Sequence, residues 1–411
     1  MNLPDEPETQ RRRAYYALLH ASFFVSYGDL LLGLCRLPIE RGKNMSTFQT
    51  VNYQTSSTTV KRNRMRNRAA AALATLLSAA VLIAGCGSNG DQAASANSNG
   101  AGEPEVLELS YQGTVEGVTF PELAEDLGYL APIKLKWIGN TISGPQDIQT
   151  VATGQADFGG AFNGAVIKLV SAGAPIRSVI SYYGMDEENY NGYFVLEDSP
   201  IKSARDLIGK KVGMNTLGAH GEFVLKEYLQ RGGLTDEEIK QVTLVALPPV
   251  NIAQSLRAGQ IDVASLGGVL RDKLSAEGGV RKLFSDFELF GAQSAGTIVF
   301  KEKFIKDNPN TVRKFVEATA KAIEWARNQP RETVIQRSEA IIKNRGRQET
   351  GTIVKYWKTT SLAGKGGTIR PEEFEIWRKW LEKSGDKKAG EVKLEDLFTN
   401  EFNPYKAEVE K

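Results

Sequence analysis

The sequence predicts an α/β protein with two similar lobes and a helical C-terminal cover. Between residues 106 and 265, short apolar runs of strand type alternate with segments of helix type, which is typical of parallel βαβ units. The segment Gly154-Gln-Ala-Asp-Phe158 is echoed 105 residues later by Gly259-Gln-Ile-Asp-Val263. In each copy a helix ends at a glycine and a buried strand begins. The echo therefore indicates two lobes with one copy each.

The first set of elements occupies residues 106–182. Its strands are expected at 106–111, 133–138, 156–159 and 177–182, and its helices at 120–127, 146–153 and 165–171. Apolar runs of strand length separated by turn residues favour the strands, and apolar positions at helical spacing favour the helices.

The second set begins after Tyr193-Phe-Val-Leu196. Its strands are expected at 211–214, 242–247 and 261–264, and its helices at 222–230 and 252–257. Ser203-Ala-Arg-Asp206 resembles a capping box, and Thr235-Asp-Glu-Glu238 has the capping-box pattern. Both indicate helix starts within this set.

From Asn308-Pro309 onward the sequence favours helices. Apolar residues recur at helical spacing from Val312 to Ala326, and further helical segments are expected at 335–342, 353–357 and 374–381. The tryptophans of this region are interpreted as core residues rather than ligand walls, because their spacing suits helices that cover a sheet. They are Trp325, Trp357, Trp377 and Trp380.

Residues 61–86 have the pattern of an export signal. Five Lys and Arg side chains lie between Lys61 and Arg68, residues 69–85 carry no charge, and Ile83-Ala-Gly-Cys86 ends the run. A basic end and a short apolar core before small residues are typical of secretory signals, and the core is short for a membrane span. The last four residues resemble the bacterial lipobox, which implies lipidation of Cys86. An ordinary buried helix with a chance cysteine is the alternative.

Met65 fits the natural start of such a signal. We therefore interpret residues 1–64 as an extension without function and residues 65–85 as a lipoprotein signal peptide. Residues 86–104 are then the lipidated cysteine and a flexible tether, since small polar residues dominate this tract.

The composition argues against several function classes. Residues 86–411 contain 40 Lys and Arg and 44 Asp and Glu, so no electrostatic footprint for nucleic acid is expected. Cys35 and Cys86 are the chain's cysteines, and His20 and His220 are its histidines. Beyond the signal, His220 is the one imidazole left to build a zinc site or a nucleophilic triad. The composition therefore argues against an enzyme, and neither a metal nor a cofactor is expected.

A family resemblance rests on motifs in the second set. The block from Ser199 to Gly213, the segment Asn215-Thr-Leu-Gly-Ala-His-Gly-Glu-Phe223 and Gly259-Gln-Ile-Asp262 resemble the nitrate/sulfonate/taurine-type substrate-binding proteins of ABC importers. The resemblance extends from about Leu107 to Pro404, and it is specific for the family but weak for the ligand.

The resemblance implies a type II periplasmic-binding-protein fold, in which two crossover strands join the lobes. The crossings are expected near Tyr193–Leu196 and Ala295–Phe300. Lobe I is then formed by residues 105–193 and 297–411, and lobe II by residues 194–296.

The function implied by the resemblance is solute capture on the extracytoplasmic face of the cell membrane. A lipid-anchored monomer would close over a small oxyanion-bearing organic solute of the aliphatic sulfonate or taurine class. It would then deliver the solute to an ABC permease and its ATPase subunits. The alternatives are a thiamine-precursor, aromatic or other heterocyclic solute, an enzyme of the same fold, and an exported sensor.

Ligands of open α/β sheets bind beyond the carboxyl ends of the strands. The turns expected there contain no Arg, Lys, Asp or Glu, so hydrogen-bond donors and helix N-termini are expected to hold an anionic group. The resemblance assigns the ligand role to Gln112, Phe162, Asn163, Thr216, Leu217, Gly218 and His220. The turn positions add Gly113, Thr114, Tyr182 and Gly267.

Two of these assignments leave alternatives. His220 either contacts the ligand or supports the helix start beside it. Tyr182 and Tyr183 are neighbours on one strand, so alternation predicts that one of them faces the cleft.

Overall fold

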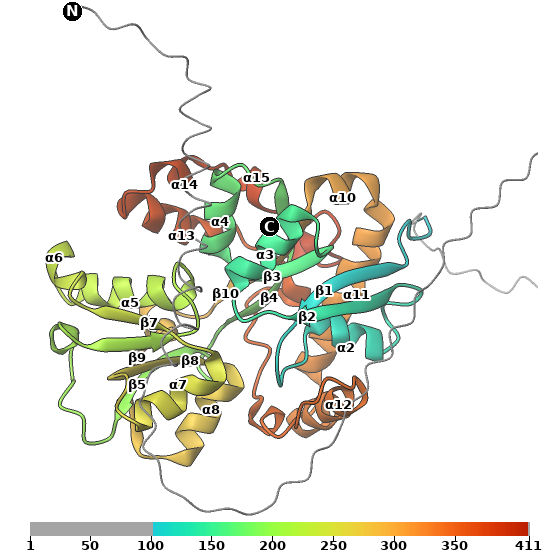
Figure 1. Cartoon of the computed structure of the whole chain (residues 1–411). Helices are drawn as coiled ribbons and strands as arrows, with labels where there is room; N and C mark the ends of the chain where they lie inside the picture. The colour runs from blue at the N-terminus through green and yellow to red at the C-terminus, as the bar shows by residue number, and fades with distance from the viewer. Residues whose placement is uncertain (1–101, 410–411) are drawn as a thin grey trace, which may run out of the picture. The chain divides into compact units, whose positions relative to one another are not determined.

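Three sheets and the helices packed against them form the described part of the chain, residues 102–409 of the computed structural model (Figure 1). The extension at 1–64, the signal peptide at 65–85 and the lipidation site Cys86 lie outside the described residues. Among the helices of residues 102–409, none combines the length and apolarity that crossing a membrane requires.

The strands form sheets of two, three and five strands. The first pairs β1 (Glu108–Gly113) with β2 (Lys134–Asn140) in parallel. The second has the order β3 (Phe158–Phe162), β10 (Gln293–Lys301), β4 (Ile176–Met185). The third has the order β7 (Thr243–Ala246), β6 (Lys211–Met214), β8 (Val263–Gly267), β5 (Asn191–Leu196), β9 (Val280–Ser285).

Helices follow most strands and dominate after β10. Those before β10 are α2 (Phe120–Asp126), α3 (Gly144–Thr153), α4 (Asn163–Ser171), α5 (His220–Arg231), α6 (Asp236–Ile239), α7 (Pro249–Arg257), α8 (Gly268–Glu277) and α9 (Asp286–Phe290). Those after it are α10 (Glu302–Asp307), α11 (Pro309–Asn328), α12 (Arg331–Asn344), α13 (Glu372–Lys383), α14 (Lys387–Glu391) and α15 (Leu394–Leu397). Single 3₁₀ turns span Arg205–Leu207, Val354–Tyr356, Lys365–Gly367 and Lys406–Glu408. The alternating α/β order and the helical C-terminal part agree with the sequence prediction.

The echoed motif has one structural role in both copies. Gly154 and Gly259 follow α3 and α7 with φ of 81° and 66°, a left-handed conformation that ends a helix and favours glycine. Asp157 then accepts the backbone N–H of Ser110 at 2.7 Å, and Asp262 accepts that of Lys211 at 2.8 Å. Each aspartate thus ties the start of a buried strand to the strand beside it.

The sheets are mixed, whereas the alternation of elements predicts parallel pairing. β1–β2, β6–β7 and β6–β8 are parallel, but β10 is antiparallel to β3 and β4, and β5 is antiparallel to β8 and β9. Both β5 and β10 immediately follow a passage of the chain from one sheet to the other. Their direction is therefore set by that passage rather than by a local βαβ unit.

The chain passes between the three- and five-stranded sheets at residues 186–190 and 286–292. Lobe boundaries at 193/194 and 296/297 remain a proposal, and the two passages favour boundaries a few residues earlier. α13 packs against both parts: Trp377 contacts Phe162 of β3 with ring centroids 4.7 Å apart, and Trp380 contacts Phe223 of α5 at 4.4 Å. Trp377 is fully buried and Trp380 nearly so, as their core interpretation requires.

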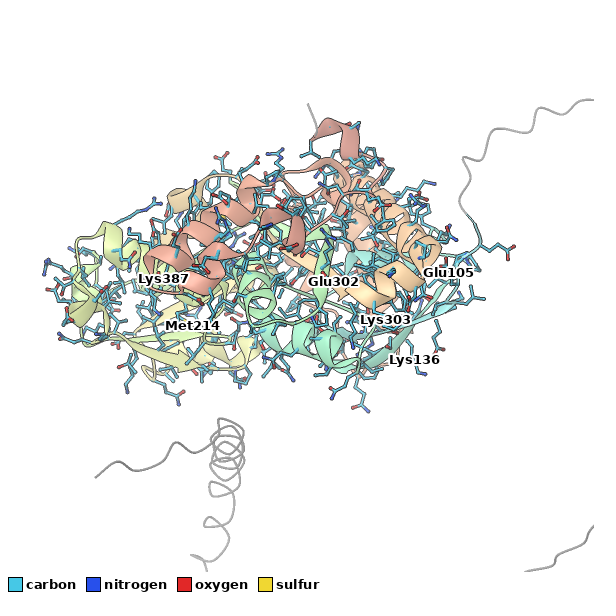
Figure 2. The ribbon with its side chains drawn as sticks, turned by 90° about the horizontal axis from the view of Figure 1, so that it is seen from above. Glu105, Lys136, Met214, Glu302, Lys303 and Lys387 are labelled. Atoms are coloured by element: carbon cyan, nitrogen blue, oxygen red, sulfur yellow. The ribbon has the colours of Figure 1, made fainter. Side chains whose placement is uncertain are left out.

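Charged side chains cover the outer surface. Lys136 and Lys303, labelled in Figure 2, have 59% and 83% of their side-chain surface exposed. The interior contains aromatic clusters such as Phe158, Phe300 and Phe315, whose rings lie 4.7 to 5.8 Å apart.

Candidate ligand-binding site

Two neighbouring cavities open where carboxyl ends of strands meet helix N-termini. The smaller has a volume of about 280 Å³ and the larger about 570 Å³. They share six lining residues: Gly144, Tyr182, Asn215, Pro249, Gly267 and Leu270. The two cavities are therefore adjacent compartments, and both are lined by residues from the three-stranded and five-stranded sides.

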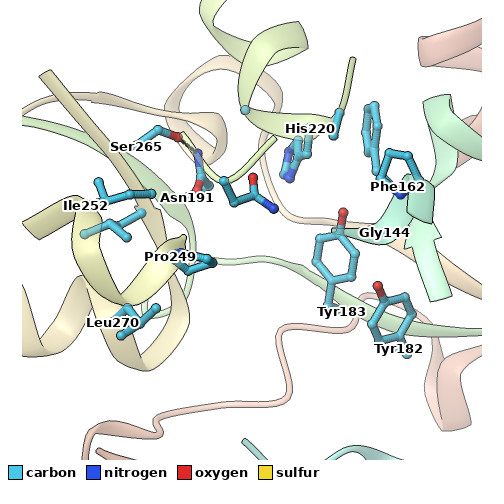
Figure 3. A pocket seen from close by; sticks show the side chains of 16 residues that line it. Gly144, Phe162, Tyr182, Tyr183, Asn191, His220, Pro249, Ile252, Ser265 and Leu270 are labelled. Atoms are coloured by element: carbon cyan, nitrogen blue, oxygen red, sulfur yellow. Dashed lines mark hydrogen bonds between the residues drawn. The ribbon is translucent and has the colours of Figure 1, made fainter. Parts of the chain in front are cut away.

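Polar and aromatic side chains line the smaller cavity. Figure 3 shows Phe162, His220 and Tyr183 on one side, with Asn191 and Ser265 opposite them. The side-chain amide of Asn191 donates a hydrogen bond to the Ser265 hydroxyl at 3.0 Å. No Lys, Arg, Asp or Glu is among the residues that line this cavity.

Helix N-termini supply donors to the smaller cavity. α5 begins at His220 and α8 at Gly268, and the residues that precede them, Ala219 and Gly267, line the cavity. Neither helix start has a side-chain cap. The first N–H groups of a helix have no partner within it and carry partial positive charge. The two helices thus offer a favourable place for an anionic group.

His220 and Asp286 face one another beside this cavity. His220 Nε2 lies 3.3 Å from Asp286 Oδ2, and neither atom has a hydrogen-bond partner among the described residues. Burial lowers the pKa of His220 to about 4 and raises that of Asp286 to about 7. The imidazole is therefore neutral at neutral pH, with its ring stacked on Phe162 at a centroid distance of 5.0 Å.

The larger cavity has a mainly apolar wall. Val115, Ile142 and Val250 line it and are 49%, 57% and 54% exposed, values that are high for large apolar side chains. Leu270 of α8 and Ile353 add to the same wall. An exposed apolar concavity of this kind suits the organic body of a ligand.

Asp147 lies among the residues that line the larger cavity. It is in the first turn of α3, only 5% exposed, and its Oδ2 accepts the backbone N–H of Gly160 at 2.7 Å. Its Oδ1 has no partner among the described residues. Burial raises the pKa of this carboxyl to about 7. The turn segments expected from the sequence contain no acidic residue, but two carboxylates line this cavity, Asp147 of α3 and Glu116 of the turn after β1.

Six of the eleven site residues expected from the sequence line a cavity. Phe162 and His220 line the smaller cavity, Gln112 and Thr114 the larger, and Tyr182 and Gly267 both. The other five, which line neither, are Gly113, Asn163, Thr216, Leu217 and Gly218.

The local contacts explain these exceptions. The fully buried Asn163 side-chain amide donates to the Glu373 carbonyl at 3.1 Å, so it joins α4 to α13. The Gly218 N–H donates to Glu222 at 2.7 Å, which occupies a donor expected to be free. The Leu217 side chain is 48% exposed, and Gly113 lies against Arg347. A ligand role for these residues remains a prediction that no cavity contact supports.

Both Tyr182 and Tyr183 line the smaller cavity, so the expectation that one of them faces the cleft is wrong. Gly296 of β10 pairs with Tyr183 and Thr297 pairs with Ser181, which leaves Tyr182 in a register shift of β4. Such an irregularity breaks the strict alternation of side chains. The sequence analysis also missed Asn191, Ser265 and Asp147, because none of them belongs to a recognisable sequence motif.

The comparisons with known proteins agree with this architecture. A family model described as "NMT1/THI5 like" matches residues 123–333, just over half of the chain. The chain belongs to the NMT1/THI5-like family. A protein of Bacillus subtilis (strain 168), by name an aliphatic sulfonates-binding protein, is 23% identical over 80% of this chain and 95% of its own length. A 4-amino-5-hydroxymethyl-2-methylpyrimidine phosphate synthase of Candida albicans is 26% identical over 46% of this chain and 58% of its own length.

Solved structures show the same fold. The periplasmic aliphatic sulphonate binding protein SsuA from Escherichia coli matches with a TM-score of 0.54 and 21% identity, over 70% of this chain and 88% of that one. The periplasmic nitrate-binding protein NrtA from Synechocystis PCC 6803 matches with a TM-score of 0.59 and 12% identity, over 73% and 88%. The periplasmic-binding-protein fold implied by the sequence motifs is therefore confirmed.

Proposed function

We propose that this protein is the solute-binding component of an ABC importer and captures a small organic solute with an oxyanion group, of the aliphatic sulfonate class. The observation that carries the proposal is the convergence of the uncapped starts of α5 and α8 on the smaller cavity. A sulfonate has a permanent negative charge and accepts several hydrogen bonds, so it suits fixed N–H donors without a titratable cation.

The organic part of the solute would occupy the larger cavity, against Val115, Ile142 and Val250. Residues from the part with the three-stranded sheet and from the part with the five-stranded sheet line both cavities. Closure of the two parts around the solute would therefore complete the site. The closed form would then be recognised by a permease and its ATPase subunits.

The localisation and anchor are part of the proposal. The related solved structures are named as periplasmic proteins, and the pattern at 61–86 is typical of export with lipidation at Cys86. A lipid-anchored monomer on the extracytoplasmic face would hold its solute near the permease and raise the local concentration.

An enzyme is the second candidate function, because relatives in the family are named as pyrimidine phosphate synthases. The unpartnered His220 and Asp286 pair beside the smaller cavity is the feature that favours it. A binding role is better supported, because the relative that matches along most of its length is named as a binding protein.

The test is a thermal-shift screen of the full chain with ethanesulfonate, taurine, hexanesulfonate and nitrate. A ligand present at about one hundred times its Kd stabilises the folded state by about 2.7 kcal/mol, so at equal concentrations the sulfonate with the highest affinity raises Tm most. NMR of the recovered solute is expected to show it unchanged. A screen without any shift from the sulfonates, or a chemically altered solute, contradicts the proposal.

A further inference from the structure

The larger cavity contains a buried acceptor that an oxyanion does not explain. Asp147 lines this cavity, and only 5% of its surface is exposed to solvent. Within residues 102–409 only one of its two oxygens is used: Oδ2 accepts the Gly160 N–H, while Oδ1 has no partner there. A buried carboxyl oxygen without a donor is costly, and native structures rarely leave one unsatisfied.

The wall of the larger cavity supplies no cation that would neutralise Asp147. No Lys or Arg is among the residues that line the larger cavity, and its other acidic residue, Glu116, is already engaged. The carboxylate of Glu116 accepts the backbone N–H groups of Thr350 and Gly351, both at 2.7 Å. The buried Gln112 Oε1 also has no partner among the described residues, and its amide can both accept and donate hydrogen bonds. Asp147 is therefore the cavity's carboxylate that lacks both a donor for one oxygen and a neutralising cation.

We propose that the solute carries a hydrogen-bond-donating amine, which pairs with Asp147 Oδ1 in the larger cavity while its apolar body packs against Val115, Ile142 and Val250. This inference rests on the proposed function for the oxyanion in the smaller cavity. Together they define the solute as an aminosulfonate with an apolar substituent. A protonated amine satisfies the free oxygen and neutralises the buried carboxylate, which a purely aliphatic sulfonate cannot do.

The geometry favours an amine over a second anion at this position. A sulfonate oxygen near Asp147 would face a second negative charge, and two like charges repel strongly when water is excluded. Burial disfavours the ionised form of Asp147, and the dipole at the start of α3 offsets only part of this effect. The ionised carboxylate is the form that attracts an ammonium group.

Isothermal titration calorimetry of the full chain with three probes tests the inference. The first is 3-(cyclohexylamino)propane-1-sulfonate, which has an amine, a sulfonate and an apolar ring. The second is 4-cyclohexylbutane-1-sulfonate, in which a methylene replaces the amine. The third is N-propylcyclohexylamine, which lacks the sulfonate. A buffer near pH 8.5 keeps the amine protonated and Asp147 ionised.

Wild-type protein is expected to bind the first probe at least about tenfold more tightly than the second, since a charge-assisted hydrogen bond contributes about 1.5–3 kcal/mol. Asp147→Asn keeps an oxygen for the Gly160 N–H but loses the charge. It is expected to bring the two affinities to within about twofold. Asp157→Asn, at an aspartate that lines neither cavity, is the matched control and is expected to keep the wild-type preference.

The outcomes separate this inference from the proposed function. Equal binding of both sulfonates by wild type, or a preference that survives Asp147→Asn, overturns the inference and leaves the sulfonate proposal intact. Asp147-dependent binding of the amine alone, without binding of either sulfonate, supports the inference and contradicts the sulfonate class. A wild type that binds none of the three probes overturns the inference.

Discussion

At the residue scale, the buried carboxyls beside the cavities set the pH dependence of stability. Burial raises the pKa of Asp286 to about 7, whereas an unfolded aspartate titrates near 3.9. Between these values the folded chain keeps a proton that the unfolded chain has lost. The stabilisation from this group is therefore complete below about pH 4 and is lost as pH rises through about 7.

Asp286→Asn removes this contribution while retaining an oxygen for the N–H groups of Asn191 and Phe287. We expect the Tm of the variant to rise relative to wild type as pH increases from about 4 to about 7. Thermal unfolding of both proteins across this range measures the difference. A difference in Tm that does not change with pH contradicts the assigned pKa.

The Tm of wild type has to be compared with that of the variant, because the titration of His220 changes stability with pH in the opposite direction to that of Asp286. Burial keeps His220 neutral with a pKa of about 4, below the ordinary value near 6.5. Its contribution to stability is lost as pH falls between these values. His220 is present in both proteins, so its effect cancels in the difference in Tm between variant and wild type. That difference reports the titration of Asp286 together with any electrostatic coupling to His220 across the 3.3 Å contact.

At the element scale, the start of α2 is held by a buried charge cluster. Thr119 caps the helix, and Glu122 completes the capping box through the Thr119 N–H at 2.9 Å. The Glu122 carboxylate also lies 2.9 Å from Arg347 Nη1 and 3.3 Å from Arg345 Nη1. This cluster attaches α2 and β1 to the segment that follows α12.

Glu122→Gln is expected to lower the free energy of unfolding by about 3–5 kcal/mol, because it leaves the buried Arg347 guanidinium without its anion. Arg345 keeps its pair with Glu349 at 2.6 Å. Denaturant unfolding measures the change. Glu108→Gln is the control: its pair with Lys136 is more than half exposed on both sides, so a change of less than about 1 kcal/mol is expected. Equal effects of the two substitutions would contradict a structural role for the cluster.

Local signals in the sequence identified most elements but not their pairing. The amphipathic stretch from Val312 to Ala326 predicts α11, which spans Pro309–Asn328, and Thr235 and Glu238 form the expected capping box. β9 was not predicted, because Arg281 and Lys282 interrupt its apolar pattern. The antiparallel direction of β5 and β10 depends on the passages between sheets, which leave no local pattern.

The same limit applies to the candidate site. Turn residues such as Gln112 and His220 could be found because strand ends are the expected place for a ligand. Asp147 could not, because an acidic residue in the first turn of a helix is common and is explained by the helix dipole alone. Its importance comes from the burial and the free oxygen that the fold imposes.

At the scale of the whole molecule, a weak hydrogen bond joins the two sides of the site. The Asn215 side-chain amide donates to the Ile142 carbonyl at 3.5 Å, from the turn after β6 to the turn after β2. On the far side of the smaller cavity, Trp380 of α13 packs against Phe223 of α5. We expect this aromatic packing to persist while the two sides of the site separate, so that the two parts move as a hinge around it.

The hinge predicts a change in molecular size on binding. Small-angle X-ray scattering of the full chain is expected to give a smaller radius of gyration with a bound sulfonate than without, because the solute favours the closed form. Asn215→Ala removes the hydrogen bond that joins the two sides and is expected to weaken binding by about two- to tenfold, the range for one hydrogen bond. Lys303→Ala, at an exposed position far from the cavities, is the control and is expected to bind like wild type. If the radius of gyration is unchanged at saturating solute, the site is preformed, and Asn215 would then affect affinity only through direct contact.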